Sequence, residues 1–281
     1  MGEGRNPGRR PEDVARYYLS DILSERAGEN PQQAVTDHSR RVHVCAPGSS
    51  AMAAFFLANL SLELARNRYP VIIHDPAEDG QIDVRALMMS VADQHTVPGI
   101  LRVSLYGLPE ILITRGEQGA EKCLGNSCHT STNVLDTQPE YVRLIGVPGS
   151  IDHLRGVGQG SYVMMVSRQD DMSLLQCYAY VKVLAGKDPG VSISLVLDES
   201  EDSRTAHVRF QRFSDRVFTK CGVSIRYLGS LVHDACLGLS MVQGKPLVLF
   251  QDASSSKEQV ISIAQEFLSW SGHVRGEGHA R

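Results

Sequence analysis

The hydrophobic positions of the chain fall into short apolar runs, separated by longer segments in which apolar residues recur with helical spacing. Nearly continuous runs of valine, isoleucine and leucine are typical of strands that are buried on both faces of a parallel sheet. The runs predict strands at 41–46, 69–75, 108–114, 141–147, 161–167, 191–198, 223–230 and 246–250. The helical spacing predicts helices at 51–66, 82–93, 172–185, 202–220, 233–242 and 256–270. Since strands and helices alternate, we expect an α/β fold with a single doubly wound, mostly parallel sheet of about seven or eight strands, flanked by helices.

Two segments lie outside this alternation and are predicted to flank the α/β domain at 41–270. Residues 1–40 are expected to contain one helix, which begins near Pro11 and ends near Glu25, followed by a polar linker. Its apolar side chains recur at helical spacing and are candidates for binding a partner: Val14, Tyr17, Tyr18, Ile22 and Leu23. Residues 271–281 are predicted to be a disordered tail.

Composition narrows the classes of function. The chain has 281 residues, of which 42% are hydrophobic, so it can bury a sizeable core. Its formal net charge of −4 gives no overall attraction to nucleic acid, and no nucleic-acid partner is predicted. The six cysteines are scattered as in a reduced protein. No stretch has the roughly 18 apolar residues that span a bilayer, so we expect a cytoplasmic protein without an integral membrane segment.

The stretch VHVCAPGSSAMAAFFLANL, residues 42–60, combines a predicted strand, a loop of small residues and a predicted helix. In α/β proteins such a junction often binds phosphate, because backbone N–H groups and the positive end of the helix dipole converge there. The loop contains neither lysine nor threonine. The sequence therefore predicts a phosphate-loop geometry without the side chains that hold phosphate and metal.

The order of these motifs resembles that of the MinD/ParA-type P-loop ATPases, and most closely the MinD and FlhG (FleN) branch. The resemblance covers about residues 41–250. It is carried by Ala58-Asn59-Leu60, by SRQDDMSLLQCYAYVKVL at 167–184 and by YLGSLVHDACLGLSMVQGKPLVL at 227–249. It implies a P-loop NTPase-like fold with a nucleotide site at the loop after the first strand of the domain.

Aligned through Ala58-Asn59-Leu60, the loop departs from the family pattern at each position that does chemistry. The family's first glycine, signature lysine, paired glycines, last glycine, phosphate-binding lysine and magnesium-binding threonine correspond to Pro47, Gly48, Ser49 with Ser50, Met52, Ala53 and Ala54. ATP hydrolysis of this type depends on electrostatic stabilisation of the transferring phosphoryl group. Ala53 supplies no charge and Ala54 no metal ligand, so the resemblance implies a degenerate site.

Further positions implied by the resemblance also differ. Gly146 stands where the family has the aspartate that holds the water on magnesium, and Ala77 replaces the second aspartate after the second strand, although Asp75 is kept. Asp198 lies where the adenine-contacting asparagine is expected, and Val232 replaces the proline of the closing turn. Departures in separate segments indicate a nucleotide site that is no longer maintained.

Other readings stay open at this point. The chain could be a divergent ATP-binding ATPase with an unconventional phosphate loop. Weak binding of an anion or nucleotide without turnover is also open, since Gly48, Ser49 and Ser50 still offer donors at a predicted helix N-terminus. The chain could bind metal through the loop residues Cys123, Cys128 and His129, although a Cys-x4-Cys-His spacing is looser than the usual knuckle. The pairs His74-Asp75 and His233-Asp234 are interpreted as a strand end and a helix N-cap rather than as metal ligands.

The favoured hypothesis is a catalytically inactive MinD/FlhG-like pseudo-ATPase that keeps the fold as an interaction or scaffold platform. The resemblance implies a role in the positioning or assembly of a polar or membrane-associated machine, such as a flagellum, a pilus or the division site. We expect protein partners, no cofactor, and no dependence of any dimer on nucleotide, because the dimer-bridging lysine is Gly48.

Overall fold

The computed structural model describes part of the chain. The described residues are 40–277, without 76–83, 90–92, 98–99, 106, 116–141, 148, 158–159 and 199–201. Within Ser39–Arg281, which forms one compact unit, the fold can be followed from strand to strand. The predicted N-terminal helix, with its candidate residues at 14–23, lies outside the described residues.

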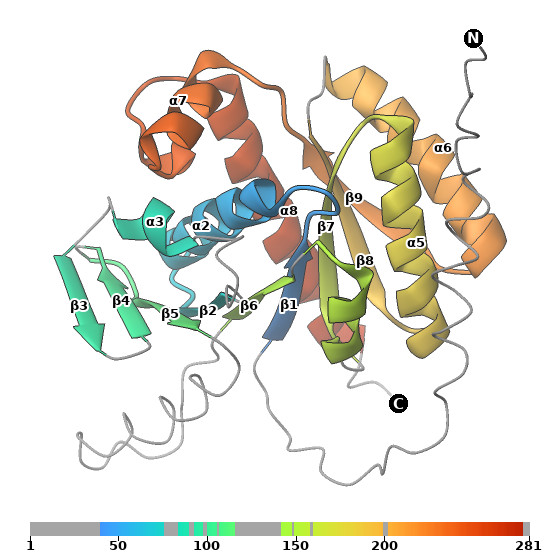
Figure 1. Cartoon of the computed structure of the whole chain (residues 1–281), viewed down its shortest axis with the longest axis horizontal. Coiled ribbons are helices and arrows are strands. Elements are labelled where there is room, and N and C mark those ends of the chain that lie inside the picture. Colours follow the sequence, from blue (N-terminus) through green and yellow to red (C-terminus); the bar gives the residue numbers. More distant parts are fainter. Residues whose placement is uncertain are drawn as a thin grey trace, which may run out of the picture. The chain divides into compact units, whose positions relative to one another are not determined.

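The described strands form one nine-stranded sheet. They are β1 (Arg40–Cys45), β2 (Val71–Asp75), β3 (Asp93–Val97), β4 (Ile100–Ser104), β5 (Ile111–Arg115), β6 (Val142–Val147), β7 (Tyr162–Arg168), β8 (Ser192–Asp198) and β9 (Ile225–Ser230). Their order is β3-β4-β5-β2-β6-β1-β7-β8-β9 (Figure 1). In this order, the strands from β5 to β9 are parallel to one another, whereas β4 is antiparallel to both of its neighbours, β3 and β5. The α/β fold class with a mostly parallel sheet is confirmed.

Helices cover both faces of this sheet (Figure 1). They are α2 (Ser50–Arg66), α3 (Val84–Met89), α5 (Asp171–Lys187), α6 (Ser203–Cys221), α7 (Ala235–Gln243) and α8 (Ser255–Glu277), with 3-10 turns η1 (Ile151–Gly156) and η2 (Leu247–Leu249). Helices α2 and α8 share one buried core with alternate residues of β1, such as Val42 and Val44. Helices α5 and α6 pack together on the opposite face.

Three details of the predicted elements differ from the structure. The predicted strands do not include the hairpin of β3 and β4. Of the predicted helix at 82–93, the structure describes α3, and Asp93 begins β3 instead of ending the helix. The predicted strand at 246–250 is instead η2. Pro246 has no N–H for a strand ladder, and the Val248 N–H is taken by a side chain, the Oδ1 atom of Asn59, 3.0 Å away.

Asn59 holds α2 against η2. Its side chain is fully buried, its Nδ2 donates to Phe55 O at 2.8 Å, and its Oδ1 accepts from Val248 N. A buried amide needs partners on both of its polar atoms, and here one partner lies 189 residues further along the chain. Asn59 thus fixes the position of the helix that begins at the candidate loop.

The apolar face of the last helix packs onto the sheet. Val260, Ile263, Ala264 and Phe267 are buried, and the Trp270 ring meets Tyr162 edge-on at 5.0 Å between centroids.

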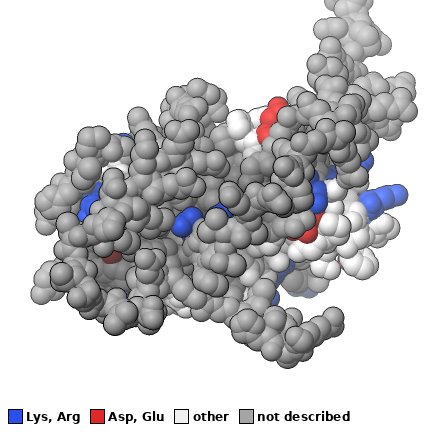
Figure 2. All heavy atoms as spheres, turned by 90° about the horizontal axis from the view of Figure 1, so that it is seen from below, with Lys and Arg blue, Asp and Glu red and all other residues white. Residues whose placement is uncertain are grey.

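Among the described helices, none combines the length and the apolar character needed to cross a membrane. In the view from below, basic and acidic side chains both appear between neutral ones over the part of that face that is not grey (Figure 2).

Candidate functional site

The loop between β1 and α2 is a tight turn closed by its own atoms. The Ser49 N–H donates to Ala46 O at 3.0 Å, and Gly48 has φ +82°, a left-handed conformation that favours glycine. Ser49 is extended and serves as the N-cap of α2, because its Oγ accepts the N–H of Met52 at 3.3 Å. The turn into the helix is therefore closed by hydrogen bonds within the chain.

This closure uses N–H groups that a phosphate loop presents to its ligand. The N–H groups of Ser49 and Met52 have partners within the loop, and the Ala53 N–H donates to Ser49 O at 3.2 Å. An anion at a helix N-terminus binds through such free donors. The Ser49 and Met52 N–H groups must each give up an internal hydrogen bond before they can bind phosphate, whereas the Ala53 bond is the first regular hydrogen bond of the helix.

Behind the loop, the first turn of α2 is buried in the apolar core. Ala53, at the position implied for the phosphate-binding lysine, is 1% exposed. Met52 and Ala54 are also buried and belong to the same core as Phe55. A charged side chain at position 53 would displace packed neighbours and lose hydration, which costs free energy in a close-packed interior.

Two other segments lie against the loop. A Cβ atom built on Gly48 would lie 3.1 Å from Oε1 of Gln176 on α5, which is tighter than most such contacts. A Cβ atom on Gly149, in the turn after β6, would lie 3.6 Å from Gly48 N and 3.8 Å from Ala46 O. The loop, the turn after β6 and α5 therefore meet at one place.

The other implied positions lie at the same edge of the sheet, because the strands that carry them are parallel. Gly146 on β6 pairs with Val44, next to the end of β1. Asp75 ends β2 and Asp198 ends β8, each two strands away from β1 on opposite sides. The structure therefore brings Gly146 to the loop and leaves Asp75 and Asp198 to either side.

The metal candidates divide between described and undescribed residues. Ala77, Cys123, Cys128 and His129 lie outside the described residues, so the loop at 122–131 stays a prediction. Within the described part of the chain, no three His, Cys, Asp or Glu side chains are grouped as a metal site requires. In β2, His74 and Asp75 are neighbours along a strand and therefore point to opposite faces.

His233 and Asp234 have separate partners. The Nε2 atom of His233, whose side chain is 43% exposed, lies 2.7 Å from Oδ1 of Asp198, whose side chain is 4% exposed. Sequence reasoning missed this pair, because the residues are 35 positions apart and neither stands in a motif that points to the other. The pair places a carboxylate and an imidazole at the edge of the sheet, beyond the end of β8.

Asp234 confirms the N-cap interpretation and extends it. Its carboxylate accepts from Leu237 N at 2.9 Å, from Ser254 Oγ at 2.6 Å and from Ser256 Oγ at 2.5 Å, which ties the start of α7 to the start of α8. Desolvation raises the pKa of this carboxyl, but the hydrogen bonds outweigh it and hold the pKa well below its usual range. The serine run at 254–256 is the signal that sequence reasoning missed.

A second polar cluster lies within the sheet. His43 on β1 and His74 on β2 are both buried, and the two strands flank β6. Burial lowers the pKa of each imidazole to about 4, with smaller contributions from charges that include Arg41. The His74 Nδ1 lies 3.1 Å from Thr114 Oγ1 on β5. Both imidazoles are therefore neutral at pH 7, and sequence reasoning did not single out His43.

Comparison with known proteins gives the fold its context. No protein-family model and no curated protein matches the sequence. Among solved structures, the cell division ATPase MinD of Pyrococcus furiosus is similar with a TM-score of 0.55 and 14% identity, over 83% of this chain and 99% of that one. The MinC:MinD cell division protein complex of Aquifex aeolicus gives 0.56 and 12%, over 82% and 96%. A ParA family ATPase from Chlorobium tepidum TLS gives 0.52 and 15%, over 81% and 98%.

These likenesses extend over most of both chains at low identity. At such identity they establish the fold and leave the chemistry to the residues of the site. The chain thus has the fold of the MinD/ParA P-loop ATPases, and the predicted resemblance is confirmed at that level.

Proposed function

We propose that this chain, which has the fold of the MinD/ParA ATPases, is a pseudo-ATPase that acts as an interaction or scaffold protein. It neither binds ATP–Mg²⁺ productively nor hydrolyses it. Its role is the spatial positioning or assembly of a polar or membrane-associated machine, of the kind to which a flagellum, a pilus and the division site belong.

The state of the loop carries this proposal. The start of α2 is capped by Ser49, and the Ser49 and Met52 N–H groups are bonded within the loop. The positions implied for the phosphate-binding lysine and the magnesium-binding threonine are Ala53 and Ala54, both buried among apolar side chains. Electrostatic stabilisation of phosphoryl transfer needs charge at this place, and neither residue carries any.

The interaction role rests on the fold and on one of its likenesses. The similar MinD of Aquifex aeolicus occurs in a complex with MinC. In that case a protein with this fold binds a protein partner. The loop and the starts of α7 and α8 are tied by hydrogen bonds within the chain. We infer that such a preformed surface serves protein partners.

The experiment is thermal unfolding with and without ATP–Mg²⁺, together with a hydrolysis assay. A ligand at about 100 times its Kd stabilises a protein by about 2.7 kcal/mol. That gain would raise the Tm by roughly 5 to 10 °C in a chain of this size. We expect no shift and no turnover above the blank, with the MinD of Pyrococcus furiosus as the positive control.

The two other readings are decided in the same experiments. A divergent ATPase would give a Tm shift and turnover, both reduced in Ser49→Ala, because Ser49 caps the helix that faces the ligand. A metal protein would be purified with zinc or iron, and would lose it in a Cys123→Ser/Cys128→Ser variant. Either result would contradict the proposed function.

A further inference from the structure

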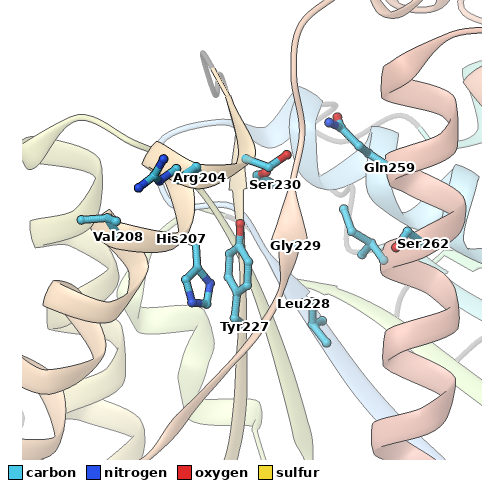
Figure 3. A pocket seen from close by; sticks show the side chains of 11 residues that line it. Arg204, His207, Val208, Tyr227, Leu228, Gly229, Ser230, Gln259 and Ser262 are labelled. Atoms are coloured by element: carbon cyan, nitrogen blue, oxygen red, sulfur yellow. The ribbon is translucent and has the colours of Figure 1, made fainter.

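A groove lies along the outermost strand of the sheet, away from the candidate loop. Strand β9 forms its floor, and α6 and α8 stand on either side (Figure 3). Its volume is about 620 Å³. The side chains that matter below are Arg204 and His207 on α6, Tyr227 on β9, and Gln259 and Ser262 on α8.

The floor of the groove has an open sheet edge. Strand β9 pairs with β8, and in the described part of the chain no strand pairs with its other side. Such an edge presents a row of backbone N–H and C=O groups that can accept a further strand. Extended peptides bind to many proteins by this addition, in which the main chain supplies affinity and the side-chain pockets supply specificity.

Strand β9 has a glycine at the point where α8 packs closely against it. Gly229 has φ +141°, and a Cβ atom on it would lie 2.9 Å from Ile263 Cγ1 on α8, so a side chain does not fit there. The register against β8 shifts next to this point, between Leu195 and Val196. A β-bulge of this kind twists the strand locally. Glycine therefore lets α8 pack closely against β9 without a side chain in between.

Aromatic contacts hold one wall of the groove in place. The Tyr227 ring lies 4.8 Å from Phe210 and 5.3 Å from His207, between ring centroids. Figure 3 shows Tyr227 on β9 beside His207, with Gln259 and Ser262 on the helix across the groove. A wall that is already ordered loses little entropy when a ligand binds, which favours affinity.

The charges of the lining favour an acidic ligand. Arg204 is the charged side chain of the described lining, which also holds His207 and includes no aspartate or glutamate. Of the described carboxylates nearby, Asp202 accepts from Thr205 N and Oγ1 at the start of α6 and is close enough to Arg204 for that positive charge to help lower the Asp202 pKa. Glu266 pairs with Arg226 at 2.5 Å. An acidic segment would therefore meet Arg204 in a groove whose described lining holds no carboxylate.

We propose that an extended, acidic segment of a protein partner binds in this groove as a tenth strand beside β9. The proposal rests on the proposed function, because it names the surface and the chemistry through which a protein partner binds. The side chains of the bound segment alternate between the walls at α6 and α8, and at least one of its carboxylates pairs with Arg204.

The test uses the full chain and a fluorescein-labelled probe of alternating Glu and Val, about eight residues long, which spans roughly 26 Å as a strand. Fluorescence anisotropy measures its Kd. Arg204→Glu is expected to weaken binding at least about tenfold, because it turns an attractive contact into a repulsive one. Arg216→Glu is the matched control: it makes the same change of charge on α6, at an exposed position outside the groove, and should leave the Kd unchanged within about twofold.

Two further probes test the strand itself. One carries N-methyl groups on its odd amides and the other on its even amides, and in a strand only one of these sets faces β9. One of the two probes should lose binding at least about tenfold more than the other. Equal binding of both, equal loss in Arg204→Glu and Arg216→Glu, or equal binding of a Lys–Val probe would overturn the proposal.

Failure of this inference is distinguishable from failure of the proposed function. If the probe does not bind and the chain shows no response to ATP–Mg²⁺, only the groove assignment falls. If the chain binds and hydrolyses ATP, the pseudo-ATPase proposal falls whatever the peptide does. The two experiments thus report on different surfaces of the molecule.

Discussion

Replacement of Asn59 by alanine tests how the helix behind the candidate loop is fixed. The change removes the Oδ1 acceptor of the Val248 N–H and leaves that buried donor without its partner. An orphaned buried donor costs about 1 to 3 kcal/mol, and the lost packing of the buried side chain adds to it. We expect a loss of about 2 to 4 kcal/mol in the free energy of unfolding.

Asn67 supplies a matched control on the same helix. Its Nδ2 donates to Glu63 O at 2.8 Å, four residues back, just as Asn59 donates to Phe55 O, but Asn67 is exposed and caps the end of α2. Asn67→Ala should cost less than about 1 kcal/mol. Urea unfolding measures the free energy of unfolding of both variants. In thermal unfolding, at about 2 to 4 °C per kcal/mol, the Tm of Asn59→Ala should fall by roughly 4 to 16 °C. Equal losses for the two variants would refute the bridge between α2 and η2.

Three further predictions concern charge. Because His43 and His74 have pKa values lowered from 6.5 to about 4, the unfolded chain binds more protons than the folded chain between these values. The free energy of unfolding should therefore be highest above about pH 6.5 and fall by up to about 3 kcal/mol per imidazole towards pH 4. Asp234→Asn should lower the urea midpoint, because it removes an ionised acceptor for Ser254 and Ser256. Ala53→Lys should destabilise the fold by about 1 to 3 kcal/mol without restoring ATP hydrolysis, since Ala53 is packed in the core.

Each of these three has a control. His43→Gln should flatten the fall in stability between about pH 6.5 and pH 4, and an unchanged slope would contradict the assignment. Asp252→Asn makes the same change as Asp234→Asn at an exposed residue nearby and should leave the urea midpoint where it is. Ala51→Lys places the same charge on the exposed side of α2, so a loss as large as that of Ala53→Lys would refute the argument from burial.

The parallel part of the sheet could be predicted because its strands are buried on both faces. The run VIIHD of β2 is buried at every position and the run SISLVLD of β8 at every position but the first, and each holds consecutive apolar residues as such strands do. The hairpin of β3 and β4 gave no such signal. Its second strand alternates between half-buried and buried residues, and its first strand, DQHTV, is polar, so helical spacing in the preceding residues extended the predicted helix into it.

The candidate site was predictable where it depends on chain order and not where it depends on tertiary contacts. The loop at 46–50 and Gly146 follow from strands whose ends meet at one edge, so their proximity could be expected. The pair of His233 with Asp198 and the joint of Asp234 with two serines arise only when α7 and α8 are packed in place. No spacing in the sequence encodes these distances.

The most direct measurement is isothermal titration of the purified chain with ATP–Mg²⁺, with the MinD of Pyrococcus furiosus measured alongside. The account predicts no saturable heat up to about 1 mM ATP, which corresponds to binding weaker than about −4 kcal/mol. One-to-one binding with a Kd near 1 μM, or about −8 kcal/mol, would contradict it. Such a result would mean that the loop opens its internal hydrogen bonds for phosphate and that this chain is a nucleotide-binding member of its fold.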